Sequence, residues 1–300
     1  MIVVTGGSGF IGSHVVDKLK EAGHEVRVFD VTPPKQSDVE FVKGDITNID
    51  DLKSALKDVE AVYHLAAVSN VNSAFENPLM NNNLNIMGTA NVLEAVRQTN
   101  VKRMLFASTV WVYGACRDEQ VYEGSPFYMP GAGHVYTSSK IAGELLCHDY
   151  QKLYGTDFTV FRYGIPYGPR ARGATVLPIF VEKAMKGEPL TIQGDGLQHR
   201  EFIYVEDLAD GNVAGLKDAG KNQTYNLCGD EPVTIKEMAE TVRKLFDNKV
   251  DIIYQEARPG DFKGKLISNR KAKAELGWKP KVSFEEGVRR YIQWLKENKT

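Results

Sequence analysis

The sequence predicts an α/β protein with a doubly wound parallel (Rossmann) sheet and a smaller mixed α/β domain that follows it. Short β-branched runs alternate with segments of helical period over the first half of the chain. A glycine-rich turn joins the first of these runs to the first helical segment, and Gly, Pro and short apolar runs become frequent after Tyr163. Strands that alternate with helices form parallel sheets covered on both faces.

The predicted elements follow one another in regular order. Strands are expected at residues 1–5, 25–29, 39–42, 61–65, 103–107 and 158–162, and helices at 10–19, 51–57, 83–98 and 137–154. We place the domain boundary near residue 164. Residues 1–164, with a returning segment near 203–228, form the first domain, and residues 165–300 form the second.

Composition narrows the class of protein. The 37 basic and 39 acidic residues leave a net charge of −2, which gives no reason to expect nucleic acid or an anionic membrane as a partner. Cys116, Cys147 and Cys228 are scattered, and no metal site is expected. No leader or membrane-length apolar stretch is evident, so a cytoplasmic protein is expected.

The turn after the first strand has the pattern of a dinucleotide site. Gly6, Gly9 and Gly12 stand three apart where the helix begins, so the backbone can approach a pyrophosphate and the helix N-terminus can attract its charge. Asp30 ends the second strand eighteen residues after Gly12. A carboxylate there accepts hydrogen bonds from ribose hydroxyls and repels a 2′-phosphate, which favours NAD over NADP.

Tyr136 and Lys140 are four residues apart at the start of a predicted helix and therefore share one face. An ammonium beside the phenol, together with the helix dipole, is expected to lower the pKa of the tyrosine towards neutrality. The tyrosinate could then take a proton from a sugar hydroxyl as hydride leaves the same carbon.

The opening TGGSGFIG, the pair Ser108-Thr109 and the YxxxK motif resemble the extended short-chain dehydrogenase/reductase family, in its nucleotide-sugar epimerase/dehydratase branch. The pattern is most similar to the UDP-glucose (galactose) 4-epimerases. The resemblance adds Thr109 to Tyr136 and Lys140 as a catalytic triad. It implies NAD contacts by Gly6, Gly9, Phe10, Ile11, Gly12, Asp30, Asp45, Ile46, Leu65, Ala66, Ala67, Asn85, Tyr136 and Lys140.

The same resemblance points to substrate contacts. Arg200 and Arg258 occupy positions that contact the phosphate or ribose of a sugar nucleotide, and Ser108 lies beside the triad. Lys265 stands where the family sets room for a C2 substituent and could pair with a carboxylate, which leaves a uronic acid open as substrate. The usual RYFN segment is RYGI here, so its asparagine is replaced by Ile165.

Thr109-Val110-Trp111 lacks the acidic residues that dehydratases and decarboxylases of this branch carry after Thr109. The favoured reaction is therefore 4-epimerisation of a UDP-hexose, by transient oxidation at C4. A 4-ketoreductase that uses NAD(P)H and a non-catalytic dinucleotide-binding sensor are the alternatives. A homodimer is expected, built on the helices near 83–98 and 137–154, whose apolar positions are Leu84, Met87, Val92, Ile141 and Leu145.

Overall fold

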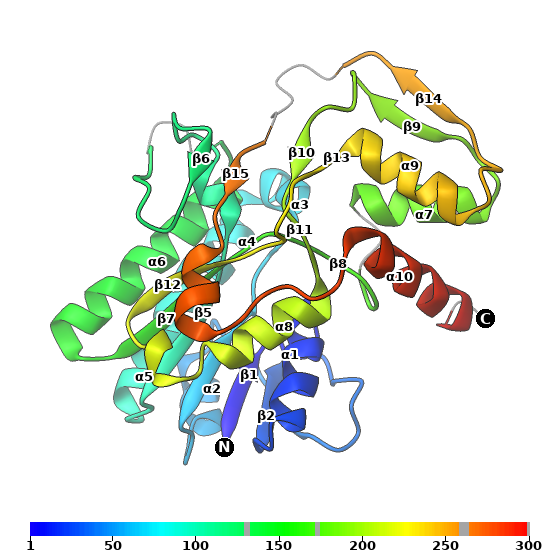
Figure 1. Cartoon of the computed structure of the whole chain (residues 1–300). Coiled ribbons are helices and arrows are strands. Elements are labelled where there is room, and N and C mark those ends of the chain that lie inside the picture. The colour runs from blue at the N-terminus through cyan, green and yellow to red at the C-terminus, as the bar shows by residue number, and fades with distance from the viewer. Residues whose placement is uncertain (129–132, 172–174, 258–263, 299–300) are drawn as a thin grey trace.

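The computed structural model describes residues 1–128, 133–171, 175–257 and 264–298. Its centre is a seven-stranded sheet of order β12-β7-β5-β4-β1-β2-β3, in which every neighbouring pair is parallel (Figure 1). The strands are β1 (Ile2–Thr5), β2 (Val26–Asp30), β3 (Glu40–Lys43), β4 (Ala61–His64), β5 (Arg103–Thr109), β7 (Asp157–Tyr163) and β12 (Gln223–Leu227). The predicted fold class is confirmed.

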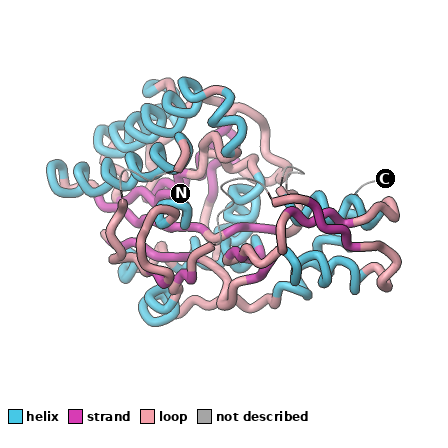
Figure 2. Tube along the Cα trace, turned by 90° about the horizontal axis from the view of Figure 1, so that it is seen from above, coloured by secondary structure: helices cyan, strands magenta, loops and turns pink. Residues whose placement is uncertain are grey.

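Helices cover both faces of this sheet, as Figure 2 shows from above. One face packs on α1 (Phe10–Glu21) and α8 (Val205–Ala214), which share a buried cluster that includes Val15, Val16 and Leu208. The other face packs on α2 (Ile49–Ala55), α5 (Gly88–Gln98) and α6 (Val135–Tyr154). The two apolar faces of the strands explain their near-continuous hydrophobic sequence.

The helix expected at 83–98 begins earlier than predicted. Asn77 caps α4 (Pro78–Asn82) by accepting a hydrogen bond from the Met80 N–H, and Pro78 occupies the first helical position. The chain then continues through a π-helical turn, η1 (Asn83–Met87), into α5. The run of polar residues before Leu84 has no helical spacing of apolar residues, so the sequence did not predict this helical start. A short helix, α3 (Val71–Glu76), was also not predicted.

The remaining elements form small sheets and a second group of helices. They are η2 (Val110–Tyr113), β6 (Gln120–Val121), β8 (Ile165–Tyr167), α7 (Val176–Met185), β9 (Leu190–Gln193), β10 (His199–Arg200), β11 (Phe202–Tyr204), η4 (Asp218–Gly220), β13 (Val233–Thr234), α9 (Ile235–Leu245), β14 (Ile252–Gln255), β15 (Leu266–Ile267), η5 (Ala272–Leu276) and α10 (Phe284–Asn298). Strand β12 and helix α8 return to the large sheet from this half of the chain. The boundary at residue 164 stays a prediction.

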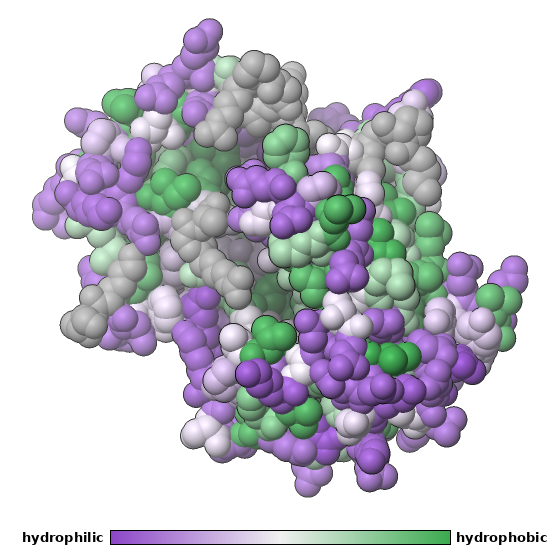
Figure 3. All heavy atoms as spheres, turned by 180° about the vertical axis from the view of Figure 1, so that it is seen from behind, coloured by the Kyte–Doolittle hydropathy of each residue, from purple (hydrophilic) through white to green (hydrophobic). Residues whose placement is uncertain are grey.

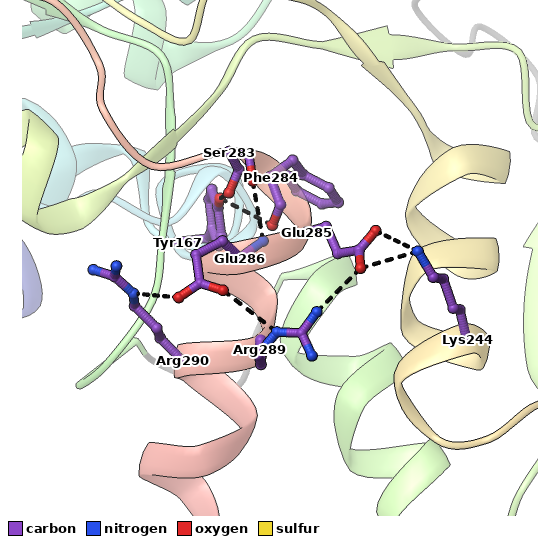
Figure 4. A network of polar contacts seen from close by, with 8 residues as sticks. All are labelled: Tyr167, Lys244, Ser283, Phe284, Glu285, Glu286, Arg289 and Arg290. Atoms are coloured by element: carbon purple, nitrogen blue, oxygen red, sulfur yellow. Dashed lines mark hydrogen bonds and ion pairs between the residues drawn. The ribbon is translucent and has the colours of Figure 1, made fainter.

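Helices α7, α9 and α10 enclose a separate core of aliphatic and aromatic side chains. Polar contacts fasten α10 to its neighbours (Figure 4). The Lys244 ammonium on α9 lies 2.8 Å from a Glu285 carboxylate oxygen, and the Tyr167 hydroxyl donates to the carbonyl oxygen of Phe284. None of the helices in the described ranges is long and apolar enough to cross a membrane.

Candidate functional site

The sequence-predicted residues meet at one edge of the large sheet. Because all its strands are parallel, the carboxyl ends of β1, β2, β4 and β5 lie at the same edge. The glycine turn, Asp30, Leu65 and Thr109 stand at or just after these strand ends. Ligands of open α/β sheets bind at this edge.

The glycines of the first turn allow a close approach that no other residue permits. Gly6 adopts a φ of +72°, in the left-handed region that favours glycine. A Cβ atom on Gly12 would lie 2.1 Å from the carbonyl oxygen of Gly6, and one on Gly6 would lie 2.6 Å from the Ala66 nitrogen. The turn is therefore packed directly against the segment that follows β4.

The N-terminus of α1 fits a bound anion. Gly9 is its N-cap and has no side chain that could accept the first-turn N–H groups. Among the described residues, no acidic side chain lies in that first turn, which Phe10 and Ile11 begin. The free N–H groups and the positive end of the helix dipole suit the pyrophosphate of a dinucleotide.

Asp30 is held in place by its own turn. Its carboxylate accepts hydrogen bonds from the backbone nitrogens of Ser8 and Thr32, each at 3.1 Å, and from the Thr32 hydroxyl at 3.2 Å. A carboxylate fixed at the end of β2 can accept hydrogen bonds from ribose hydroxyls, and its charge opposes a 2′-phosphate. The arrangement fits NAD better than NADP.

Two of the other predicted cofactor residues serve the protein itself. Asp45 accepts hydrogen bonds from the Thr47 nitrogen and hydroxyl, both at 2.8 Å, so it caps a local turn. Ile46 is buried in the core against Gly88 of α5. The contact of Asp45 with an adenine ring stays a prediction.

Asn85 braces the segment after β4. It is buried, its amide nitrogen donates to the Val68 carbonyl and the Ser139 hydroxyl, each at 3.0 Å, and its carbonyl accepts from the Val68 nitrogen at 2.8 Å. Leu65, Ala66 and Ala67 come directly before Val68 and are partly exposed at the sheet edge. Asn85 thus positions the small residues expected to line a nicotinamide.

The three predicted catalytic side chains come together from two elements. Thr109 ends β5, whereas Tyr136 and Lys140 lie one turn apart in α6. The Lys140 ammonium donates to the carbonyl oxygen of Ala107, two residues before Thr109, at 2.8 Å, so the start of α6 lies against the end of β5. All three side chains are buried.

The electrostatics of this group differ from the sequence expectation. Burial raises the pKa of Tyr136 to about 12, although the Thr109 side chain favours the phenolate. Burial also lowers the pKa of Lys140 to about 8. The prediction that Lys140 and the helix dipole lower the Tyr136 pKa towards neutrality is wrong, because desolvation of the buried phenolate dominates the shift.

The predicted substrate residues divide into three cases. Arg200 lies with its guanidinium carbon 5.4 Å from the centre of the Trp111 ring and faces the site. The Ser108 hydroxyl donates to the buried carboxylate of Glu144 instead of facing the site. Arg258 lies outside the described residues.

Lys265 is placed differently from the expectation. Its ammonium donates to the carbonyl oxygens of Cys116 at 2.7 Å and Asp118 at 2.8 Å. These contacts tie the strand β15 region to the loop before β6. They direct the charge towards the backbone, and a contact between Lys265 and the substrate stays a prediction.

Sequence reasoning missed several residues of the site. Val110, Trp111 and Glu201 line a pocket together with Arg200. Burial raises the pKa of Glu201 to about 7. The signal available in the sequence was position, since Val110 and Trp111 directly follow Thr109, and Glu201 directly follows Arg200.

Comparisons with known proteins agree with this geometry. Residues 2–228 match the model of the NAD dependent epimerase/dehydratase family. The chain is 36% identical to a putative UDP-glucose 4-epimerase of Methanocaldococcus jannaschii, over 99% of each protein. The crystal structure of a Thermotoga maritima UDP-glucose 4-epimerase with UDP-glucose matches with a TM-score of 0.92, at 30% identity over 100% of this chain and 99% of that one.

A third match holds both expected ligands. It is the structure of UDP-glucuronic acid 4-epimerase from Bacillus cereus in complex with UDP-glucuronic acid and NAD, with a TM-score of 0.89 and 30% identity over 99% of each chain.

Proposed function

The chain belongs to the NAD-dependent epimerase/dehydratase family, and from this premise we propose that it is an NAD-dependent 4-epimerase of a nucleotide hexose, with UDP as the nucleotide. The observation that carries the proposal is the buried Thr109–Tyr136–Lys140 group, next to a glycine turn that fits a dinucleotide. Relatives named as epimerases cover nearly the whole chain.

The chain's own residues have definite tasks in this reaction. Bound NAD would supply a hydride acceptor and donor. Tyr136 exchanges a proton with the oxygen on C4 of the sugar, and the Thr109 hydroxyl binds the same oxygen. Lys140, held by the Ala107 carbonyl, keeps a positive charge on the same face of α6. The N-terminus of α1 and Asp30 hold the two ends of the adenosine diphosphate half.

Val110 and Trp111 argue against the other reactions of the family. Elimination of water from a hexose requires an acid for the leaving hydroxyl and a base for the C5 proton. Neither Val110 nor Trp111 can exchange a proton. Epimerisation needs no group beyond the triad and a retained cofactor, so it is the reaction best matched by these side chains.

Two alternatives remain as outcomes of the test. A 4-ketoreductase would use the same triad but exchange its cofactor at each turnover, and Asp30 disfavours the NADPH that such an enzyme commonly draws on. A non-catalytic sensor would bind dinucleotide without needing Thr109, Tyr136 and Lys140 together. The retained triad favours an enzyme.

We also propose a homodimer formed by the face of α3 to α6. Phe75, Leu79, Met87 and Leu145 expose between 47% and 81% of their surface on these helices. Figure 3, which views the molecule from behind, shows hydrophobic side chains gathered over this helical side. Exposed apolar patches of this kind mark interaction surfaces. Val92 and Ile141, two of the apolar positions predicted to be buried on these helices, belong to the core.

The test is to incubate the purified protein, without added cofactor, with UDP-glucose, UDP-galactose and their N-acetyl and uronic-acid counterparts. Proton NMR then reports inversion at C4. Inversion of a donor is the expected result, and Tyr136→Phe is the matched inactive control. If no donor is inverted, even with NAD supplied, the protein is not a UDP-hexose 4-epimerase.

A further inference from the structure

An apolar wall lies beside the proposed reaction centre and has no task in the proton and hydride transfers. It consists of Val110, Trp111, Ile165 and Ile267, which line one pocket together with Arg200 and Glu201. Val110 and Trp111 belong to the 3-10 turn η2, Ile165 begins β8, and Ile267 ends β15. Four apolar side chains from three separate elements therefore converge beside a site expected to bind a sugar.

The wall adjoins the reacting atoms. Val110 and Trp111 directly follow Thr109, and Thr109 is paired across the sheet with Tyr163, two residues before Ile165. The Trp111 ring lies 5.8 Å from the His134 ring, which in turn lies 6.2 Å from the Tyr136 ring. A sugar with its C4 oxygen on Thr109 and Tyr136 must therefore place one flank near this wall.

The polar side chains that line the pocket with the wall are those of His199, Arg200, Glu201 and Lys265. Lys265 directs its ammonium to two backbone carbonyls, and Arg200 stacks on Trp111 while it donates to the His199 carbonyl at 2.7 Å. Glu201 is buried and accepts from the Ile267 nitrogen at 3.3 Å. The negative charge of an ionised Glu201 would repel a second carboxylate placed in the pocket.

The chemistry of hexoses decides which flank suits this wall. C3 carries a hydroxyl in ordinary hexoses and needs a polar partner, whereas C5 carries a hydroxymethyl, a carboxylate or a methyl group. Only the methyl group needs no hydrogen bond. We propose that the preferred substrate is a nucleoside-diphosphate 6-deoxyhexose, an inference that rests on the proposed function. Its C5 methyl group packs against Val110, Trp111, Ile165 and Ile267.

The expected preference follows from the cost of burying polar groups. An apolar pocket rejects an added hydroxyl only moderately, so kcat/KM for a UDP-6-deoxyhexose should exceed that for the matching hexose by about tenfold. A uronate should be poorer than both, because its carboxylate would lose water without gaining a partner. The expected order of kcat/KM is thus 6-deoxyhexose, hexose, uronate.

The test compares UDP-6-deoxyglucose, UDP-glucose and UDP-glucuronate on NAD-loaded protein. We would measure kcat/KM for C4 inversion by NMR, and the dissociation constant of each sugar nucleotide by calorimetry. Val110→Thr and, independently, Ile165→Thr add a hydroxyl to the wall and should reduce the preference for the 6-deoxy sugar to near parity. Ile253→Thr, on the exposed strand β14, is the matched control and should leave the preference unchanged.

Two results would overturn the inference: a hexose or uronate preferred over the 6-deoxy sugar, or a preference that neither wall variant alters. The failure of the proposed function looks different. If no sugar is inverted but the dissociation constants keep the expected order, 4-epimerisation is wrong and the wall assignment stands. If inversion occurs with the order reversed, 4-epimerisation stands and the wall assignment is wrong.

Discussion

The Lys140 ammonium on α6 donates to the carbonyl oxygen of Ala107 at 2.8 Å, which fixes the first turns of α6, where Tyr136 lies, against the end of β5, where Thr109 lies. Burial raises the pKa of the Tyr136 phenol to about 12, even though the Thr109 side chain favours the phenolate. Thr109 and Tyr136 each carry a hydroxyl, and two hydroxyls held near each other can bind one further oxygen between them. The proposed role of both residues at the sugar C4 oxygen depends on this arrangement.

Tyr136→Phe should lower kcat for C4 inversion by about 10²- to 10⁴-fold, the usual contribution of a positioned acid–base group. The fold and the amount of NAD that copurifies should not change, because the variant removes one hydroxyl. Tyr154→Phe, at an exposed position of the same helix, is the control. An activity within tenfold of wild type would show that Tyr136 is not the proton acceptor.

Glu144→Gln should destabilise the fold by about 3 kcal/mol, because it leaves the Arg162 guanidinium buried without a counter-charge. The two side chains are 2% and 6% exposed, with 2.7 Å between Arg162 Nη2 and Glu144 Oε2. Urea unfolding at neutral pH measures the effect. Asp247→Asn, in the exposed pair with Lys249, should cause no measurable change. If the two variants changed the free energy of unfolding by similar amounts, burial would not be the reason for the effect of Glu144→Gln.

Glu201→Gln should stabilise the protein at pH 8 more than at pH 5. The pKa of Glu201 is raised from 4.5 to about 7 by burial, so the folded state keeps a proton that the unfolded state releases. The contribution of protonated Glu201 to the free energy of unfolding therefore falls as pH rises from 4.5 to 7. The fall is complete above pH 7 and amounts to about 3 kcal/mol.

Urea unfolding of wild type and Glu201→Gln at both pH values checks the difference. The neutral amide can still accept the hydrogen bond from the Ile267 nitrogen. Glu285→Gln is the control, because the contact with Lys244 lowers the pKa of the Glu285 carboxyl. Removing this carboxylate should not increase the stability of the protein at pH 8. A gain for Glu201→Gln that is equal at pH 5 and pH 8 would refute the assigned titration.

Leu145→Glu should convert the protein from dimer to monomer in sedimentation experiments. Leu145 is 47% exposed on α6, within the apolar face of α3 to α6, and a buried unpaired charge opposes association. Ile179→Glu changes a residue of similar exposure on α7 and should leave the dimer intact. A monomeric wild type, or a Leu145→Glu protein that remains dimeric, would exclude this face as the interface.

The order of strands and helices could be predicted because their periodicity is local. The TGGSGFIG turn and Asp30 were recognisable since glycine at a close approach and a carboxylate at a strand end have few other uses in this pattern. The direction of a long side chain is not local. Lys265 reaches carbonyls of Cys116 and Asp118, and those partners are distant in the chain.

The electrostatics were also beyond prediction from spacing. The interval between Tyr136 and Lys140 placed both on one face of α6, but it carried no information on burial, which sets the sign of both pKa shifts. Ser108 likewise alternates away from Thr109 along β5, and its contact with Glu144 depends on how α6 packs. The apolar wall is formed by elements that meet only in the folded chain.

The central claim, reversible oxidation at C4 by a retained cofactor, is tested most directly with a UDP-sugar that carries deuterium on C4. The protein would be incubated without added cofactor, and NMR would locate the deuterium in the product. We predict inversion at C4 with the deuterium still on C4. Deuterium on C6 would indicate 4,6-dehydration. Turnover only with added NAD(P)+, with the deuterium transferred to the free cofactor and a 4-ketosugar released, would indicate a 4-ketoreductase running in reverse. Either result would contradict the account.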